Sequence, residues 1–125
     1  MYLTREQALE LHKLGFLKTY YDGEIAPCDF YSFKDEEWIL GGRILPQGDL
    51  LAPEEVISGG IWLPSIQDLL YWLSDHDFTF VIESKERGHG YKVNVCKEEK
   101  NYMGKGGTVE FALYKVIVRI LEQKR

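Results

Sequence analysis

The chain has 125 residues, with 15 Lys and Arg against 20 Asp and Glu, which gives a formal net charge of −5. A chain of this length can bury roughly two thirds of its unfolded surface, so it needs neither a metal ion nor disulfides in order to fold. Its 45% hydrophobic and 28% charged residues, without an apolar run of about 18 residues, exclude a disordered chain and a membrane-spanning chain.

The negative charge argues against binding to DNA or RNA, because sequence-independent binding depends on Lys and Arg that neutralise phosphates. The basic residues form no stripe along the chain. Two cysteines, Cys28 and Cys96, are too few and too far apart to indicate a disulfide framework, and the N-terminal residues do not resemble a secretion signal. We therefore expect a cytoplasmic protein that binds neither nucleic acid nor membrane.

The N-terminal segment predicts a helix of about ten residues. Thr4 is a suitable N-cap, and Gln7 stands three residues later and completes a capping box. Leu3 is placed to pack against Ala8 on the apolar face of this helix. Gly15 supplies the left-handed residue that ends a helix.

The segment from 18 to 60 is irregular and holds three of the four prolines. Two short runs within it, 30–33 and 38–40, predict strands that pair as a hairpin. Aromatic side chains complete small cores and are also enriched at binding hot spots, so their density here supports either core completion or a partner-binding surface. The candidate partner-binding residues are Tyr20, Tyr21, Tyr31 and Trp38.

The second half of the chain has clearer patterns. Ser65 and Asp68 form a second capping box, and apolar residues at helical spacing predict a helix over 65–75. A β-hairpin follows over 78–97, with a polar connection that contains glycine. One antiparallel register joins apolar residues on one face and opposite charges on the other: Phe80 with Val95, Ile82 with Val93, and Glu83 with Lys92.

A flexible stretch over 97–107 leads to a last helix over 108–123, which has the strongest helical periodicity in the chain. This helix carries a second apolar row beside the first, and that row requires a cover. The cover is either the 18–60 segment or another chain, so a homodimer is one possibility. The second row consists of Phe111, Tyr114, Val118 and Leu121.

These elements predict one α+β domain over residues 1–125, with an irregular N-terminal part (1–60) and a helix–hairpin–helix core (61–125). We expect a small antiparallel sheet centred on the 78–97 hairpin, with the helices over 65–75 and 108–123 packed on one face. Short strands from 28–45 are expected to extend that sheet, and the N-terminal helix completes the fold.

The order of these signals resembles that of small uncharacterised α+β proteins from phage, prophage and bacterial genomes, most closely over residues 62–123. The resemblance implies a fold and a genomic context, and it brings no catalytic residues. It is carried by Leu3-Thr4-Arg5-Glu6-Gln7, Leu14-Gly15-Phe16, Trp62-Leu63-Pro64-Ser65, Asp68-Leu69-Leu70-Tyr71-Trp72-Leu73, Tyr91-Lys92-Val93-Asn94-Val95 and Gly107-Thr108-Val109-Glu110-Phe111-Ala112-Leu113.

Few residue patterns suggest chemistry. The glycine-rich segment 104–108 places Lys105 before a helix start, as in a phosphate-binding loop, although the glycine spacing differs from that of nucleotide-binding loops. Asp75-His76-Asp77 offers metal-ligand residue types, but adjacent side chains diverge and a histidine at this place simply caps a helix. We expect no catalytic, cofactor-binding or metal site.

The favoured function is therefore that of a non-enzymatic interaction protein of phage or bacterial origin, whose protein partner the sequence does not identify. One alternative is a small anion- or nucleotide-binding enzyme that uses the 104–108 segment. Another is an acidic mimic of DNA, suggested by the net charge and by three acidic clusters. These clusters are Asp35-Glu36-Glu37, Glu54-Glu55 and Glu98-Glu99.

Overall fold

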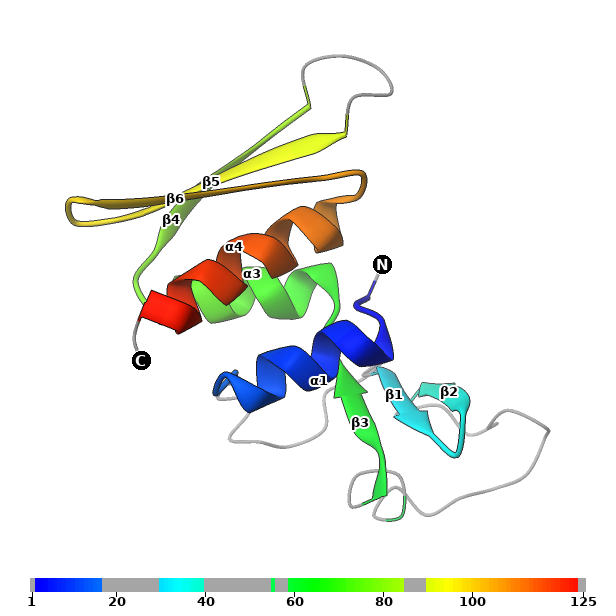
Figure 1. Ribbon diagram of the computed structural model, residues 1–125. Helices are drawn as coiled ribbons and strands as arrows, with labels where there is room; N and C mark the ends of the chain where they lie inside the picture. Colours follow the sequence, from blue (N-terminus) through cyan, green and yellow to red (C-terminus); the bar gives the residue numbers. More distant parts are fainter. Residues whose placement is uncertain (1, 17–29, 40–54, 56–58, 85–89, 124–125) are drawn as a thin grey trace.

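The computed structural model describes residues 2–16, 30–39, 55, 59–84 and 90–123. Within these residues the chain forms helices and two three-stranded antiparallel sheets (Figure 1). The elements are α1 (Arg5–Lys13), β1 (Phe30–Phe33), β2 (Glu36–Ile39), β3 (Ile61–Leu63), α3 (Ile66–Asp75), β4 (Thr79–Glu83), β5 (Tyr91–Lys97), β6 (Lys100–Gly106) and α4 (Val109–Gln123).

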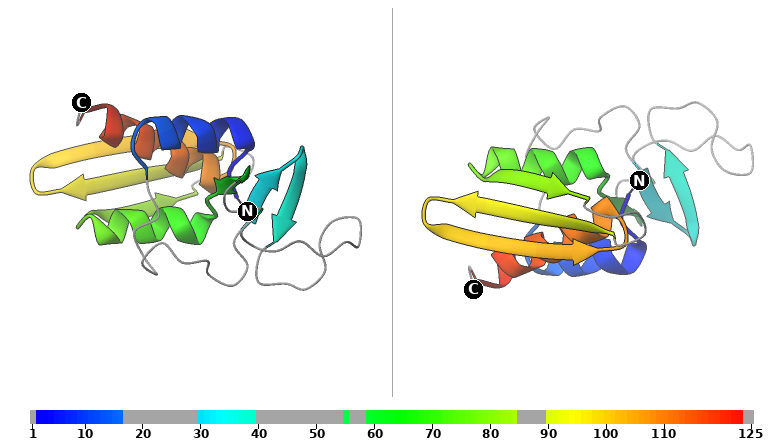
Figure 2. Two further views of the ribbon diagram at one scale, coloured as in Figure 1. Left: turned by 90° about the horizontal axis from the view of Figure 1, so that it is seen from below. Right: turned by 90° about the horizontal axis from the view of Figure 1, so that it is seen from above.

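The main sheet has the strand order β4-β5-β6, and α3 and α4 both lie on one of its faces (Figures 1 and 2). The expected α+β fold, with two helices on one face and an N-terminal helix, is confirmed. The register of the β4–β5 hairpin is also the predicted one, with Phe80 opposite Val95 and Glu83 opposite Lys92. Val93 and Val95 are buried beneath the helices, because the alternation of the strand directs them inward.

The third strand of the main sheet was not expected. Residues 100–106, which the sequence places in a flexible stretch, form β6 and pair with β5 along its whole length, from Lys97 opposite Lys100 to Tyr91 opposite Gly106. The turn between the two strands has Glu98 at a positive φ of 55°. Strand β6 is rich in glycine and lysine, so it lacks the β-branched residues that signal a strand.

The hairpin predicted near residues 30–40 is present, but the expectation that it extends the main sheet is wrong. Strand β1 pairs with β2 on one side and with β3 on the other, which makes a separate sheet of order β2-β1-β3. Tyr31 lies opposite both Trp38 and Trp62. Strand β3 is only three residues long, and a run that short has no periodicity from which to predict a partner.

Both predicted capping boxes are formed. In α1 the Thr4 side chain accepts from the backbone N–H of Gln7, whose side chain accepts from the N–H of Thr4. Ser65 and Asp68 make the same exchange at the start of α3. The two helix starts are adjacent, because the backbone N–H of Leu3 donates to the carbonyl of Pro64 at 2.9 Å.

The two helices also end in the same way. The N–H of Phe16 donates to the carbonyl of Leu11, and Gly15 has a φ of +100°, which together form a Schellman motif. In α3 the N–H of Phe78 donates to the carbonyl of Leu73, but the left-handed position is held by Asp77, with a φ of 65°. The two motifs turn Phe16 and Phe78 back onto the core, where both rings are buried.

A chain of aromatic contacts links these elements. The Phe16 ring stacks on Trp62 at 5.9 Å and on Trp72 at 5.4 Å between ring centroids, and Trp72 also stacks on Phe78 at 6.2 Å. The rings come from β3, the end of α1, α3 and the approach to β4. Each ring is buried in one continuous hydrophobic cluster, which joins the small sheet to the main sheet.

The two helix ends predict opposite responses to substitution. We expect Gly15→Ala to lower the free energy of unfolding by about 1–2 kcal/mol, because a Cβ is disfavoured at a left-handed position. We expect Asp77→Gly to raise it by up to about 1 kcal/mol, because the strain of a non-glycine residue there is relieved. Urea unfolding followed by circular dichroism measures both changes; equal stability of Gly15→Ala and the parent would contradict this account.

Candidate functional site

The aromatic residues proposed as a partner-binding surface divide into two groups. Tyr20 and Tyr21 lie outside the described residues. Tyr31 and Trp38 are only 7% and 5% exposed and belong to the hydrophobic core, where the Trp38 indole donates to the carbonyl of Phe33 at 3.1 Å. For these two residues the structure supports core completion, the first of the two interpretations left open by the sequence.

The glycines of the 104–108 segment allow a helix to approach a strand. A Cβ added at Gly104 would lie 2.5 Å from the carbonyl oxygen of Ala112 in α4, and one at Gly106 would lie 2.9 Å from the ring of Phe111. Because side chains alternate along a strand, Lys105 lies on the opposite face of the sheet from α4. The lysine and the start of the helix therefore do not converge on one site, as a phosphate-binding loop would require.

The start of α4 is capped by Thr108. The Thr108 hydroxyl oxygen accepts from the backbone N–H of Phe111 at 3.2 Å, and the carbonyl of Thr108 accepts from the N–H of Ala112 at 3.1 Å. The threonine thus satisfies one of the N–H groups at the helix start that an anion would otherwise bind.

This packing predicts different costs for two neighbouring glycines. Gly104→Ala forces the backbone of α4 away from β6, and we expect it to lower the free energy of unfolding by about 1–3 kcal/mol. Gly107→Ala is the matched control, because no atom lies within 4 Å of its added Cβ, and we expect little change. Thermal unfolding of both variants measures the difference. Similar stabilities would show that the close helix–strand contact is not formed.

The Asp75-His76-Asp77 sequence lies at the end of α3. The His76 Nδ1 atom is 2.8 Å from the carbonyl oxygen of Trp72, and because a carbonyl only accepts, Nδ1 donates. The His76 ring also stacks on Trp72 at 4.2 Å between centroids, so the histidine closes the helix end. Across the part of the chain that the structure describes, no three His, Cys, Asp or Glu side chains are grouped to hold a metal ion.

The acidic clusters at 35–37 and 98–99 do not share one surface. Asp35 lies in the β1–β2 turn of the small sheet, whereas Glu98 and Glu99 lie in the β5–β6 turn of the main sheet, at the other end of the molecule (Figure 1). Glu54 lies outside the described residues. This separation does not support a DNA mimic, which needs one continuous acidic face. In the described part of the chain, no helix has the length and apolar character needed to cross a membrane.

The second apolar row of α4 is covered in part by α1, which is neither of the two covers expected from the sequence (Figure 2). The Tyr114 hydroxyl donates to a carboxylate oxygen of Glu10 in α1 at 2.9 Å. Tyr114 and Val118 are half-buried against the core, and Leu121 is buried. This row therefore gives little support for a homodimer.

Burial of the Tyr114 ring, the hydrogen bond to Glu10 and the negative charges of Glu10 and Glu122 raise the pKa of Tyr114 to about 12. The hydrogen bond to Glu37, followed by burial and by the charge of Glu37, raises the pKa of Tyr2 to about 12. A phenol with a raised pKa stabilises the fold while it is protonated. This stabilisation is complete below pH 10, the ordinary pKa, and is lost as the pH rises to about 12.

An alkaline titration tests the contact between α1 and α4. We expect Glu10→Gln to lower the pKa of Tyr114 but to leave it above 10, because burial, the largest cause of the shift, remains. Ultraviolet absorbance of the phenolate measures the titration, and Tyr114→Phe identifies the contribution of this residue. Tyr2 serves as an internal control, since its partner is unchanged. An unaltered pKa of Tyr114 in Glu10→Gln would argue against the contact.

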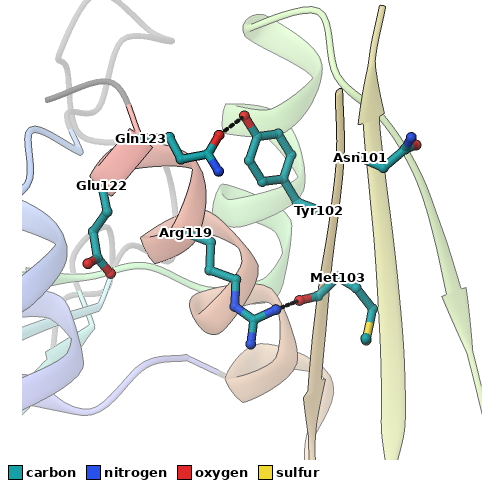
Figure 3. A pocket seen from close by; sticks show the side chains of 6 residues that line it. All are labelled: Asn101, Tyr102, Met103, Arg119, Glu122 and Gln123. Atoms are coloured by element: carbon teal, nitrogen blue, oxygen red, sulfur yellow. Dashed lines mark hydrogen bonds between the residues drawn. The ribbon is translucent and has the colours of Figure 1, made fainter. Parts of the chain in front are cut away.

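An open depression of about 510 Å³ lies between β6 and the C-terminal half of α4 (Figure 3). Its polar groups largely satisfy one another: Arg119 donates to the Met103 carbonyl, and the Tyr102 hydroxyl donates to the Gln123 side chain at 2.9 Å. The Met103 carbonyl points away from β5, so Arg119 occupies the free edge of β6. The arrangement braces α4 against that edge, without a carboxylate or nucleophile aimed at a common point.

The most exposed large apolar side chains of the main sheet lie on β4 and at the start of β5. Val81 is 57% exposed, Ile82 is 37% exposed and Tyr91 is 36% exposed. Strand β4 is at the edge of the sheet, and no described strand pairs with its outer side. The only other large apolar side chain of comparable exposure among the described residues is Tyr71 of α3. The sequence predicts the strand but not its position at the edge, because that position depends on the order of the strands.

Comparisons with known protein families, with curated proteins and with solved structures find no match to this chain. The resemblance to phage-associated proteins stays a prediction.

Proposed function

We propose that the chain is a non-enzymatic protein-interaction module, and that its contact surface is the apolar edge formed by β4 and the start of β5. The observation that carries this proposal is the exposure of three apolar side chains at and beside this edge: Val81 lies on the open face of the sheet, whereas Ile82 and Tyr91 lie on the face that carries the helices. An apolar strand at a sheet edge offers both hydrophobic surface and backbone groups ready to pair with another chain.

The origin and location of this module are separate proposals. A phage or bacterial source is supported by the resemblance over residues 62–123, and a cytoplasmic location by the small number of cysteines. The enzymatic alternative has no comparable support, because Lys105 and the start of α4 lie on opposite faces of the sheet.

Site-specific photo-crosslinking tests the contact surface. We expect a benzophenone amino acid at position 91 to form adducts with a protein partner in a bacterial cell that expresses the chain, because Tyr91 is exposed at the proposed contact. The matched control carries the same group at position 6, since Glu6 is also exposed but belongs to α1, on the far side of the helices from the main sheet (Figure 1). Mass spectrometry identifies the adducts.

An adduct formed at position 91 and absent at position 6 supports the proposed surface, whether the captured protein is a second copy or a different chain. Equal labelling from both positions, or labelling from neither, contradicts it.

A further inference from the structure

The two edges of the main sheet differ in how they are protected. Strand β6 carries Lys100 and Lys105, and its Met103 carbonyl already accepts a hydrogen bond from Arg119. Both features discourage pairing with another strand. Strand β4 has neither lysine nor proline among its five residues, and four of them are β-branched or aromatic. Among the described residues, β4 is therefore the edge that lacks such protection.

The sequence of β4 is complementary to itself. When two copies of Thr79–Glu83 run antiparallel with Val81 at the centre, Val81 meets Val81 of the second copy and Phe80 meets Ile82. Thr79 then meets Glu83, so like charges are not opposed. This register uses all five residues, whereas a shift of one residue toward the start of the strand places Glu83 opposite Asp77.

The faces of the strand match in this register. Phe80 and Ile82 lie on the face that carries α3 and α4, because they pair with the inward-facing Val95 and Val93. A second copy therefore places its own Phe80 and Ile82 on the same side as these residues. The backbone hydrogen-bonding groups also match. Along a strand edge, alternate residues direct their N–H and C=O groups outward. In this register residues 79, 81 and 83 meet only one another, and residues 80 and 82 meet each other, so outward-directed groups always face outward-directed groups.

We propose that two copies of this chain associate through β4, antiparallel and centred on Val81, to form one continuous six-stranded sheet. The proposal rests on the proposed function, and it names the partner of that surface as a second copy. A second copy is favoured over a different protein because the apolar and charged residues of β4 fit their own reversed sequence without a mismatch. The contact is isologous, as in most two-fold dimers.

The first test is the association state of the full chain. We expect analytical ultracentrifugation to detect a dimer. We expect Val81→Lys to raise the dissociation constant of this dimer tenfold or more, because the substitution places two lysines opposite each other at the two-fold axis. Val81 is 57% exposed, so the lysine is accommodated in the monomer and the circular dichroism spectrum is retained. Lys105→Glu, on the β6 edge, is the matched control and leaves the dimer intact.

The second test fixes the register and does not depend on a charged substitution. In a background of Cys28→Ser and Cys96→Ser, Val81→Cys places two thiols opposite each other, and we expect rapid disulfide formation between the two copies on mild oxidation. Thr79→Cys is the matched control on the same face of the same strand. Its thiols lie about 13 Å apart along the antiparallel pair, so they do not cross-link.

A parent chain that stays monomeric at high micromolar concentration overturns this proposal, as does a dimer that survives Val81→Lys unchanged. A dimer in which position 79 cross-links as readily as position 81 also overturns it. These failures are distinguishable from failure of the proposed function. A monomeric chain that still captures a different protein from position 91 retains the interaction surface and loses only the second copy.

Discussion

The close approach of α4 to β6 is the contact on which the rest of the structure depends. It exists because Gly104 and Gly106 have no side chains between the strand and the helix, which lets α4 pack directly on the face of β6. From that position one side of α4 covers the inner face of β5 and β6, while its other sides contact α3 and α1 (Figures 1 and 2). A single helix with a wide apolar surface thus serves as the common neighbour of four other elements. Its buried residues are Ala112, Leu113, Val116, Ile117, Ile120 and Leu121.

Features that depend on neighbouring residues in the chain could be predicted from the sequence. The capping boxes of Thr4 and Ser65 involve side chains three residues apart, so the residue types alone identify them. The register of the β4–β5 hairpin follows from alternation, because a slip by one residue would expose Val93 and Val95. The same apolar patterns identify the buried face of the β4–β5 hairpin and the helices that cover it, so the α+β architecture was predictable.

Features that depend on distant contacts were not predictable. Gly104 and Gly106 look like a phosphate-binding or flexible segment until α4 is seen against them, because the sequence of a strand does not show which backbone approaches it. The prediction that the strands near residues 30–40 extend the main sheet is wrong for a similar reason. Their true neighbour, Ile61–Leu63, is too short to be predicted as a strand from its sequence. Tyr31 and Trp38 have the residue types of a binding surface and of a core alike, and only their burial decides between the two.

The turn between β1 and β2 bears on the order in which the molecule assembles. Lys34 and Asp35 both adopt positive φ values, of 50° and 61°, without a glycine to favour them, so this hairpin has little local tendency to form. Its sheet also requires Phe30 to meet Leu63, which is distant in the chain, whereas α3, the main sheet and α4 are contiguous in the chain. During synthesis β1 and β2 therefore leave the ribosome before the residues against which they pack have been made. We expect them to fold only after the C-terminal half has folded.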